Sequence, residues 1–145
     1  MVVTGTIVNR PSNLNQQSYQ TTASVLPGDI DEQDHVNNMV YLRWVQEIAI
    51  AHWRVLASPE TQKAISWVVL RHEIDYKAPA VLGDEVQLLT WVGKATRLTF
   101  ERFTEIKRKN GGQLLASART LWCPIDPNNG KPTRVPPEVR AQFST

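Results

Sequence analysis

The sequence predicts an α+β domain in which one long apolar helix packs against an antiparallel sheet. Residues 39–56 contain no Gly or Pro and are apolar over most of a helical circumference, which is typical of a helix buried on most sides. Residues 67–78 alternate between apolar and charged side chains, as a half-buried strand does. Three more strand-like segments follow, separated by turns that contain glycine. We expect the helix to cover the apolar face of the sheet that these strands form.

The N-terminal residues divide into an arm and a first strand. Residues 1–17 are rich in Asn, Gln, Ser and Thr and show no sustained period, so we expect a flexible arm. Residues 18–26 alternate in polarity and end at Pro27 and Gly28, which predicts a strand. Residues 18–145 are expected to form one domain, because a chain of 145 residues is long enough for a single core.

The long helix is expected to begin at Asn37 or Asn38, since Asn is a favourable N-cap. One narrow stripe at helical spacing is mostly polar and is expected to face solvent: Arg43, Gln46, Glu47, Ile50 and Arg54. Residues 57–64 indicate a loop with one helical turn capped by Ser58. Pro136 and Pro137 are expected to open a short terminal helix.

Four later strands, at 67–78, 85–92, 97–108 and 113–123, are expected to form an antiparallel meander and complete a five-stranded sheet. In the first of them we expect one parity to face the core: Val68, Leu70, His72, Ile74 and Tyr76. Long uncovered sheet edges favour pairing with a second copy. We therefore expect a homo-oligomer, either a dimer or a dimer of dimers.

Composition excludes several classes of function. The net charge is +2, too small to make nucleic acid or an anionic membrane the expected partner. The longest apolar runs hold only a few residues, so neither a membrane span nor a signal peptide is predicted. The single cysteine, Cys123, excludes an internal disulfide framework and a cysteine-based zinc site. We expect a soluble cytoplasmic protein.

The segment 28–38 contains the candidate catalytic residues. Four carboxylates and one imidazole lie within seven residues, directly before the start of the long helix: Asp29, Asp31, Glu32, Asp34 and His35. Free N–H groups at a helix start favour a developing negative charge. A carboxylate there could attack a bound carbonyl or deprotonate a water, while the amides hold the oxyanion. By pattern alone, the same side chains could simply cap turns and the helix.

A calcium loop is a sharper alternative for this segment, because it begins with D-x-D. Such a loop needs Gly at its sixth position and Glu at its twelfth, where this chain has Asp34 and Val40. One imidazole without a second His or Cys nearby is too little for zinc. We expect no metal.

Four sequence segments together indicate a family. D-I-D at 29–31 is followed by H-V-N-N-M-V-Y-L-R-W at 35–44, I-D-Y-K-A-P at 74–79 and L-G-D-E-V at 82–86. This combination resembles the hot-dog-fold acyl-CoA thioesterases of the 4-hydroxybenzoyl-CoA thioesterase type, over roughly residues 18–125. The resemblance implies a five-stranded antiparallel sheet wrapped around one long central helix. It also implies hydrolysis of a coenzyme A thioester, without metal or organic cofactor, in a site between two subunits.

The resemblance also implies roles for individual residues. Asp31, the second Asp of D-x-D, is the expected catalytic carboxylate, and the amide at or near Asn38 is expected to polarise the thioester carbonyl. His35 is expected to carry a proton or orient water. Asn37 and Tyr41 are the expected substrate-binding residues of this segment.

Asp29 is expected to hold the turn rather than react. Asp34 occupies a position where the family usually has Gly, which affects the turn. Coenzyme A phosphates require basic side chains at a pocket rim, and the basic residues cluster between Lys94 and Lys109. The candidates are Arg97, Arg102, Lys107, Arg108 and Lys109, of which Arg97 and Arg102 are selected as substrate-binding residues. The alternative is a solvated strand face on which basic residues alternate with Glu101 and Glu105.

Two other functions stay open. An acyl-thioester hydratase or dehydratase of the same fold would need a His paired with an acid at the acyl Cα and Cβ. A non-catalytic module that binds acyl thioesters or oligomerises would keep the fold and lose turnover. The sequence specifies neither the acyl group nor whether coenzyme A or acyl carrier protein carries it.

Overall fold

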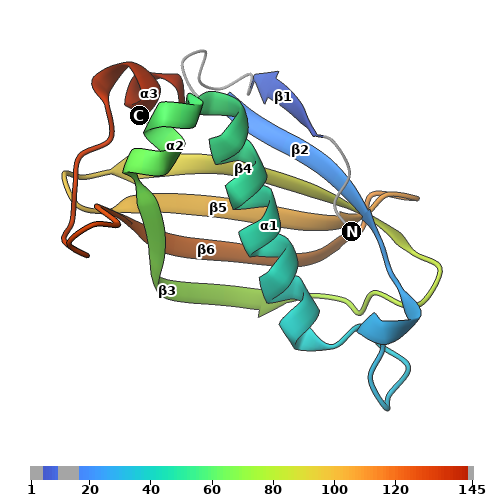
Figure 1. Ribbon diagram of the computed structural model, residues 1–145. Coiled ribbons are helices and arrows are strands. Elements are labelled where there is room, and N and C mark those ends of the chain that lie inside the picture. The colour runs from blue at the N-terminus through green and yellow to red at the C-terminus, as the bar shows by residue number, and fades with distance from the viewer. Residues whose placement is uncertain (1–4, 10–16, 144–145) are drawn as a thin grey trace.

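The computed structural model describes residues 5–9 and 17–143. Its six strands form one antiparallel sheet, and the long helix α1 (Asn38–Leu56) crosses one face of that sheet (Figure 1). In order across the sheet, the strands are β1 (Thr6–Asn9), β2 (Gln17–Ser24), β4 (Glu85–Ala95), β5 (Phe100–Arg108), β6 (Leu114–Ile125) and β3 (Ser66–Tyr76). The α+β arrangement of a sheet curved around one helix is therefore confirmed.

The predicted meander is wrong at β3. Only β4, β5 and β6 follow one another as neighbours, and β3 pairs with β6 at the far edge of the sheet. The reason is the length of the connection between β3 and β4, residues 77–84, which is too long for the usual hairpin loop of two to five residues. This connection crosses from one side of the sheet to the other, with the N–H of Lys77 bonded to Leu115 and that of Val25 bonded to Asp84.

The sheet has six strands because part of the N-terminal arm joins it. Thr6–Asn9 pairs antiparallel with β2, with Ile7 opposite Tyr19. A four-residue strand is too short to show a period in the sequence. The expectation of flexibility for the rest of the arm concerns residues 1–4 and 10–16, which lie outside the described residues.

A bulge changes which side chains of β3 face the core. The register with β6 shifts between Val69 and Arg71, so the inward parity is odd before the bulge and even after it. His72 and Ile74 are half-buried as predicted. Val68 and Leu70, which we expected in the core, are 38% and 57% exposed because of this shift. Tyr76 keeps the predicted parity but is 44% exposed, because it is the last residue of β3 and lines an open pocket.

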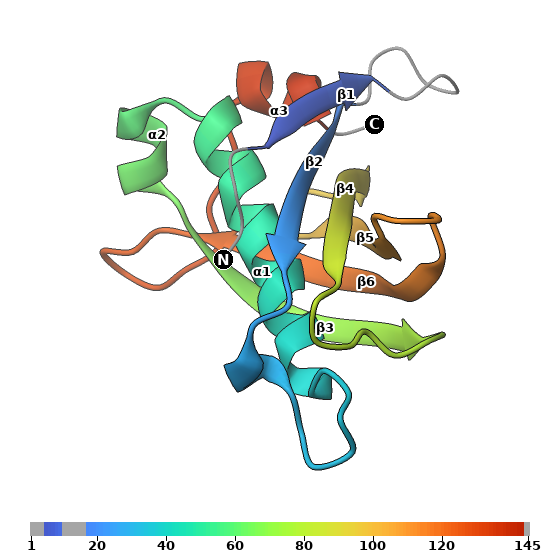
Figure 2. The same cartoon turned by 90° about the vertical axis from the view of Figure 1, so that its right-hand side faces the viewer.

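The helices agree with the sequence. Asn37 caps α1, since its side-chain oxygen accepts the N–H of Met39 at 2.9 Å. The predicted stripe on α1 faces solvent, except that Glu47 is half-buried. Ser58 caps α2 (Pro59–Ala64), and α3 (Pro137–Phe143) closes the chain. Figure 2 shows α2 and α3 at one end of α1 and the loop at 30–37 at its other end.

The core consists of two apolar clusters. The first contains Trp44, Val45 and Ile48 of α1 with Leu88 and Ile106, and the second contains Ala49 and Trp53 of α1 with Val92, Phe100 and Trp122. Between them lies a layer of buried polar side chains from α1 and the strands. We call this layer the polar seam; its members are His52 of α1 with Thr90, Arg102, Thr104 and Thr120 of the strands. The first cluster adjoins the 30–37 loop, whereas the second adjoins α3.

Candidate active site

The loop that carries Asp31 is a tight, self-bonded turn. Ile30 and Val36 form an isolated antiparallel bridge, and the N–H of Asp31 donates to the carbonyl of His35 at 2.8 Å. One carboxylate oxygen of Asp31, Oδ1, accepts the N–H of Gln33 at 2.9 Å and that of His35 at 3.3 Å. No described residue bonds the other oxygen, Oδ2. The loop therefore orients the carboxylate and leaves one oxygen available to a ligand.

Asp34 allows this turn to close. Its φ is +62°, in the left-handed region that favours glycine and tolerates Asp and Asn. The departure from the family pattern at this position therefore preserves the backbone conformation that Gly would adopt.

The helix N-terminus supplies a free amide beside Asp31. Asn37 uses its side chain as the cap and donates its own N–H to the carbonyl of Asp29 at 2.8 Å. The N–H of Asn38, the first helical residue, has no acceptor among the described residues. An unbonded N–H at a helix start attracts negative charge.

The predicted residues gather around one open pocket of about 250 Å³. Its lining includes five of them: Asp31, His35, Asn37, Asn38 and Tyr41. Besides Val36, the lining contains three residues that we did not expect: Gln33, Tyr76 and Pro79. Gln33 lies inside the catalytic loop, and the other two belong to the I-D-Y-K-A-P motif, which is the sequence signal that could have identified them.

Two tyrosines form one wall of the pocket. Tyr41 is 2% exposed, its hydroxyl accepts the N–H of Ala80 at 2.9 Å, and its ring meets that of Tyr76 edge to face at 5.3 Å. The hydroxyl of Tyr76 donates to the carbonyl of Asn38 at 3.3 Å. Burial raises the pKa of both phenols, so both stay neutral. Tyr41 is therefore a buried wall residue of the pocket, whereas Tyr76 fixes the first peptide of α1.

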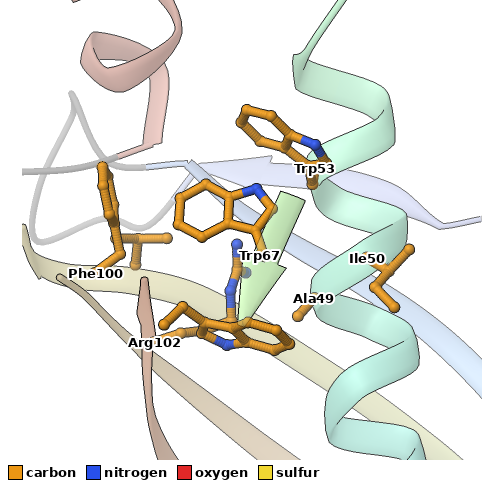
Figure 3. A pocket seen from close by; sticks show the side chains of 8 residues that line it. Ala49, Ile50, Trp53, Trp67, Phe100 and Arg102 are labelled. Atoms are coloured by element: carbon orange, nitrogen blue, oxygen red, sulfur yellow. The ribbon is translucent and has the colours of Figure 1, made fainter. Parts of the chain in front are cut away.

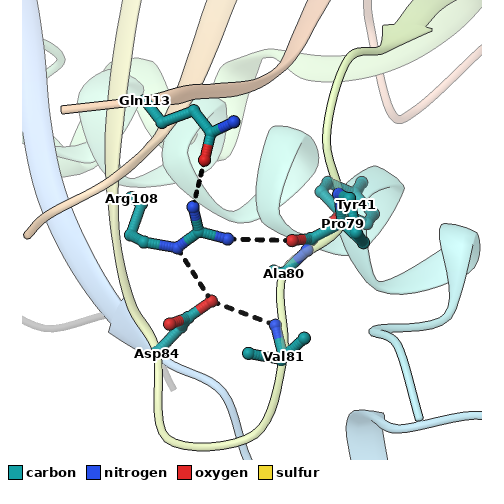
Figure 4. Close-up of polar contacts among 7 residues, drawn as sticks. All are labelled: Tyr41, Pro79, Ala80, Val81, Asp84, Arg108 and Gln113. Atoms are coloured by element: carbon teal, nitrogen blue, oxygen red, sulfur yellow. Dashed lines mark hydrogen bonds and ion pairs between the residues drawn. The ribbon is translucent and has the colours of Figure 1, made fainter. Parts of the chain in front are cut away.

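The connection between β3 and β4 clamps this wall in place. Ala80 accepts the N–H of Val36 at 2.9 Å and donates to Tyr41, so it holds the loop and the helix together. Arg108 donates to the carbonyl of Pro79 at 2.9 Å and to the carboxylate of Asp84 at 3.2 Å, and it also bonds Gln113 (Figure 4). The L-G-D-E-V motif thus contributes an ion pair that supports the pocket.

Asp29 holds the turn, as expected. Its side chain is 5% exposed and accepts the N–H of Leu26 at 2.9 Å and the guanidinium of Arg43 at 3.1 Å. Both oxygens are occupied, so Asp29 is a support for the loop.

The two predicted coenzyme A contacts do not line this pocket in the single chain. Arg97 is exposed in the turn between β4 and β5. Arg102 is 6% exposed on the inner face of β5, in the polar seam. It does not belong to a solvated face with Glu101 and Glu105, because those two side chains point to the opposite side of the strand.

Comparison with known proteins agrees with this geometry. Residues 25–143 match the profile of a family described as the thioesterase-like superfamily. The chain belongs to this superfamily. The fold expected from the motifs, the hot-dog fold, is the fold of its members, and the resemblance to hot-dog thioesterases is confirmed.

Individual relatives include both acyl-CoA and acyl-carrier-protein enzymes. The long-chain acyl-CoA thioesterase FadM of Escherichia coli is 28% identical over 86% of this chain and 96% of its own length. The chloroplastic acyl-[acyl-carrier-protein] hydrolase FATB2 of Cuphea viscosissima is 27% identical over 68% of this chain. The match spans about a quarter of the plant protein, 26% of its length.

A solved structure shows the same similarity in three dimensions. YbaW, a probable thioesterase from Escherichia coli, superposes with a TM-score of 0.71 at 28% identity, over 85% of this chain and 94% of that one. Within residues 5–9 and 17–143, no three His, Cys, Asp or Glu side chains gather as metal ligands would. In the same part of the chain no helix is long and apolar enough to cross a membrane.

Proposed function

We propose that the protein is an acyl-CoA thioesterase that hydrolyses a coenzyme A thioester to a free acid and coenzyme A. The observation that supports this best is the pairing in one pocket of the Asp31 carboxylate with the unbonded N–H of Asn38. Membership of the thioesterase-like superfamily supports the same reaction. The E. coli relative that matches over nearly its whole length acts on long-chain acyl-CoA, which favours coenzyme A over acyl carrier protein.

The reaction begins with the thioester carbonyl on the Asn38 N–H, at the positive end of α1. Asp31 Oδ2 takes a proton from a water whose oxygen attacks the carbonyl carbon. The resulting oxyanion stays on the amide. When it collapses, the C–S bond breaks, and the thiolate of coenzyme A takes up the proton that Asp31 received.

A nucleophilic route uses the same geometry. Asp31 attacks the carbonyl directly, the thiolate leaves, and water then cleaves the mixed anhydride. A single turnover in H₂¹⁸O detects this route when water attacks the Asp31 side of the anhydride, because ¹⁸O then enters the enzyme. General-base catalysis, like attack of water on the acyl side, puts ¹⁸O only into the product acid. We favour the general base, because Oδ1 is held by two N–H groups and only Oδ2 is open.

His35 is proposed to orient water. Its side chain is exposed and lines the pocket, and Asp31 and Asn38 already supply the base and the electrophile. Asn37 fixes the helix start and Tyr41 presents its ring to the acyl group.

The assembly is proposed to be a homodimer, or a dimer of dimers, that forms through the free edge of β3 and completes the site between subunits. β3 is an edge strand whose side away from β6 is unpaired by the described residues. It exposes Leu70 and Tyr76, and the latter lines the pocket. We expect light scattering to give twice the 16.4 kDa chain mass or a higher even multiple. A stable, active monomer at micromolar concentration would contradict this assembly.

A thiol-release assay tests the proposed function. Purified protein is incubated with acyl-CoA esters of increasing chain length, with an aryl-CoA and with an acyl carrier protein thioester. We expect release of the coenzyme A thiol. Loss of an enoyl-CoA absorbance without thiol would show a hydratase, and tight binding without turnover would show a binding module; either result overturns the proposal. Arg97 as a phosphate contact and the cytoplasmic location stay predictions.

A further inference from the structure

A second cavity lies in the other half of the molecule. Its volume is about 40 Å³, and it opens between α1 and the beginning of β3, beside Ile50, which is 42% exposed. Aromatic side chains dominate its lining, among them Trp67, Phe100 and Trp122. The one charged group in the lining is Arg102, which Figure 3 shows among these rings. The cavity shares no lining residue with the Asp31 pocket.

The buried charge of Arg102 has neutral partners. Its guanidinium lies 3.0 Å from Nδ1 of His52 and donates to the hydroxyl of Thr90 at 3.1 Å. Burial, and then the charge of Arg102, lower the pKa of His52 to about 2, so the imidazole is neutral and accepts at Nδ1. Burial lowers the pKa of Arg102 to about 10, which leaves the guanidinium charged at pH 7.

The described part of the chain supplies no anion that balances this charge. Among these residues, no carboxylate lies within 4.0 Å of Arg102. Buried charges in proteins are normally paired, because an unpaired one costs several kcal/mol in desolvation. Within the described residues, the guanidinium therefore lacks a counter-ion.

Indole donors in the same lining also lack acceptors. Trp122 is 8% exposed and the Nε1 atom of Trp67 is buried, yet neither indole N–H has a partner among the described residues. Buried donors of this kind are rare unless a ligand or water accepts from them. Together with the guanidinium, they indicate a ligand that carries acceptor oxygens.

The shape and lining specify the ligand class. A guanidinium fork matches a carboxylate, and aromatic walls match an apolar body. A water molecule needs about 10–15 Å³ of such volume, so the cavity has room for a carboxylate and the one or two carbons next to it. The end of a slightly longer chain would extend through the opening beside Ile50. We propose that Arg102 and the surrounding aromatic cavity form a second binding site, separate from the Asp31 pocket, for the carboxylate of a short apolar acid. The binding does not depend on the proposed function.

Indole NMR signals test this directly, because the chain has five tryptophans. Three line the cavity, Trp53, Trp67 and Trp122, whereas Trp44 and Trp91 do not. We expect millimolar butyrate to shift the three cavity signals in a saturable way and to leave the other two unmoved. Butyramide, the uncharged isostere, should produce none of these shifts. Equal shifts from butyramide or from chloride, or no shift from butyrate, would overturn the proposal.

Variants identify the residue responsible. Arg102→Met should abolish the butyrate shifts, while unchanged Trp44 and Trp91 signals verify the fold. If that variant does not fold, Arg102→Lys keeps the charge without the fork and should weaken binding at least severalfold. Arg97→Met is the matched control and should bind as the wild type does. Undiminished binding by the Arg102 variant would refute the site.

A last experiment distinguishes two ligands of the cavity, a free acid and a carboxylate at the far end of the acyl chain of a thioester. In Asp31→Asn, butyrate should still shift the cavity signals, whether or not the protein releases thiol. If glutaryl-CoA shifts them and butyrate does not, the carboxylate belongs to a thioester substrate and the separate acid site is refuted.

Discussion

The two ends of α1 bury polar groups in opposite ways. At the N-terminal end, Asp31 lies in a loop that satisfies one of its oxygens with local N–H groups and exposes the other to an open pocket. About 20 Å along the helix, as the rise per residue requires, His52 of α1 and Arg102 of β5 are buried between the helix and the sheet and bond one another. The first arrangement leaves a reactive group accessible, whereas the second stores a charge in the core.

The Asp31 pocket and the polar seam are held in place by different kinds of contact. The Asp31 pocket depends on contacts close in sequence, reinforced by Ala80 and Arg108 from the β3–β4 connection and β5. The polar seam depends on the register of β4, β5 and β6, which places Thr90 opposite Thr104 and Arg102 opposite Thr120. A change in one region should therefore leave the other measurable.

The largest expected effect is on Asp31. Asp31→Asn should keep the fold and lower kcat by about a hundredfold or more, the scale of losing a positioned base. Asp34→Asn is the matched control, since it removes a carboxylate from the same loop and keeps a residue that tolerates positive φ. It should retain nearly full thiol release. Unchanged turnover in folded Asp31→Asn would exclude Asp31 from the reaction.

The second prediction concerns His52 and stability. Its pKa is about 2 in the folded chain and 6.5 as an ordinary imidazole. Below pH 6.5, His52 therefore binds a proton in the unfolded chain but not in the folded chain. The free energy of unfolding falls as the pH falls. The slope is about 1.4 kcal/mol per pH unit, so the loss attributable to His52 reaches about 2 kcal/mol at pH 5.

Urea unfolding at pH 7.5 and pH 5.0 checks this value. His52→Gln should lose about 2 kcal/mol less than the wild type between the two pH values. Burial also lowers the pKa of His72, which adds a loss of the same sign to both proteins. Equal losses in His52→Gln and wild type would show that His52 titrates normally.

The third prediction distinguishes two roles of His35, orienting water and transferring a proton. If it orients water, His35→Gln should lower kcat by less than about tenfold, and the pH profile of kcat should keep its shape. If it transfers a proton in the rate-limiting step, one limb of the profile should disappear in the variant. The comparison uses one acyl-CoA for both proteins.

The smallest effect is expected at Asp34. Asp34→Ala should lower the free energy of unfolding by about 1 kcal/mol, because an Ala side chain resists the left-handed conformation that φ of +62° requires. Asp34→Gly should keep or exceed wild-type stability. Thermal unfolding measures both, and an Ala variant as stable as the wild type would show that the turn relaxes.

The sequence predicts the features that depend on residues close together in the chain. Asn37 as cap, the buried faces of α1 and the Ser58 cap of α2 follow from residues within a few positions of each other. The gathering of Asp31, His35 and Asn38 follows as well, since the loop and the helix start are adjacent.

Features that depend on pairing between distant strands were not predictable from one sequence. The place of β3 beside β6 and the bulge at Leu70 depend on pairing partners more than 40 residues away. The bulge reverses the parity of the strand, so alternation alone assigned Val68 and Leu70 to the wrong face. The seam was missed for the same reason: Arg102 reads as one of several surface cations until the register places it opposite Thr120.

The central claim, that the Asn38 N–H and Asp31 act on one carbonyl, is tested most directly by amide NMR with an acyl-CoA analogue in which a methylene replaces the thioester sulfur. This ketone binds without being hydrolysed. We predict a downfield shift of the Asn38 amide proton and perturbed amides at residues 31–35. Tight binding of the analogue with an unmoved Asn38 amide would contradict the account.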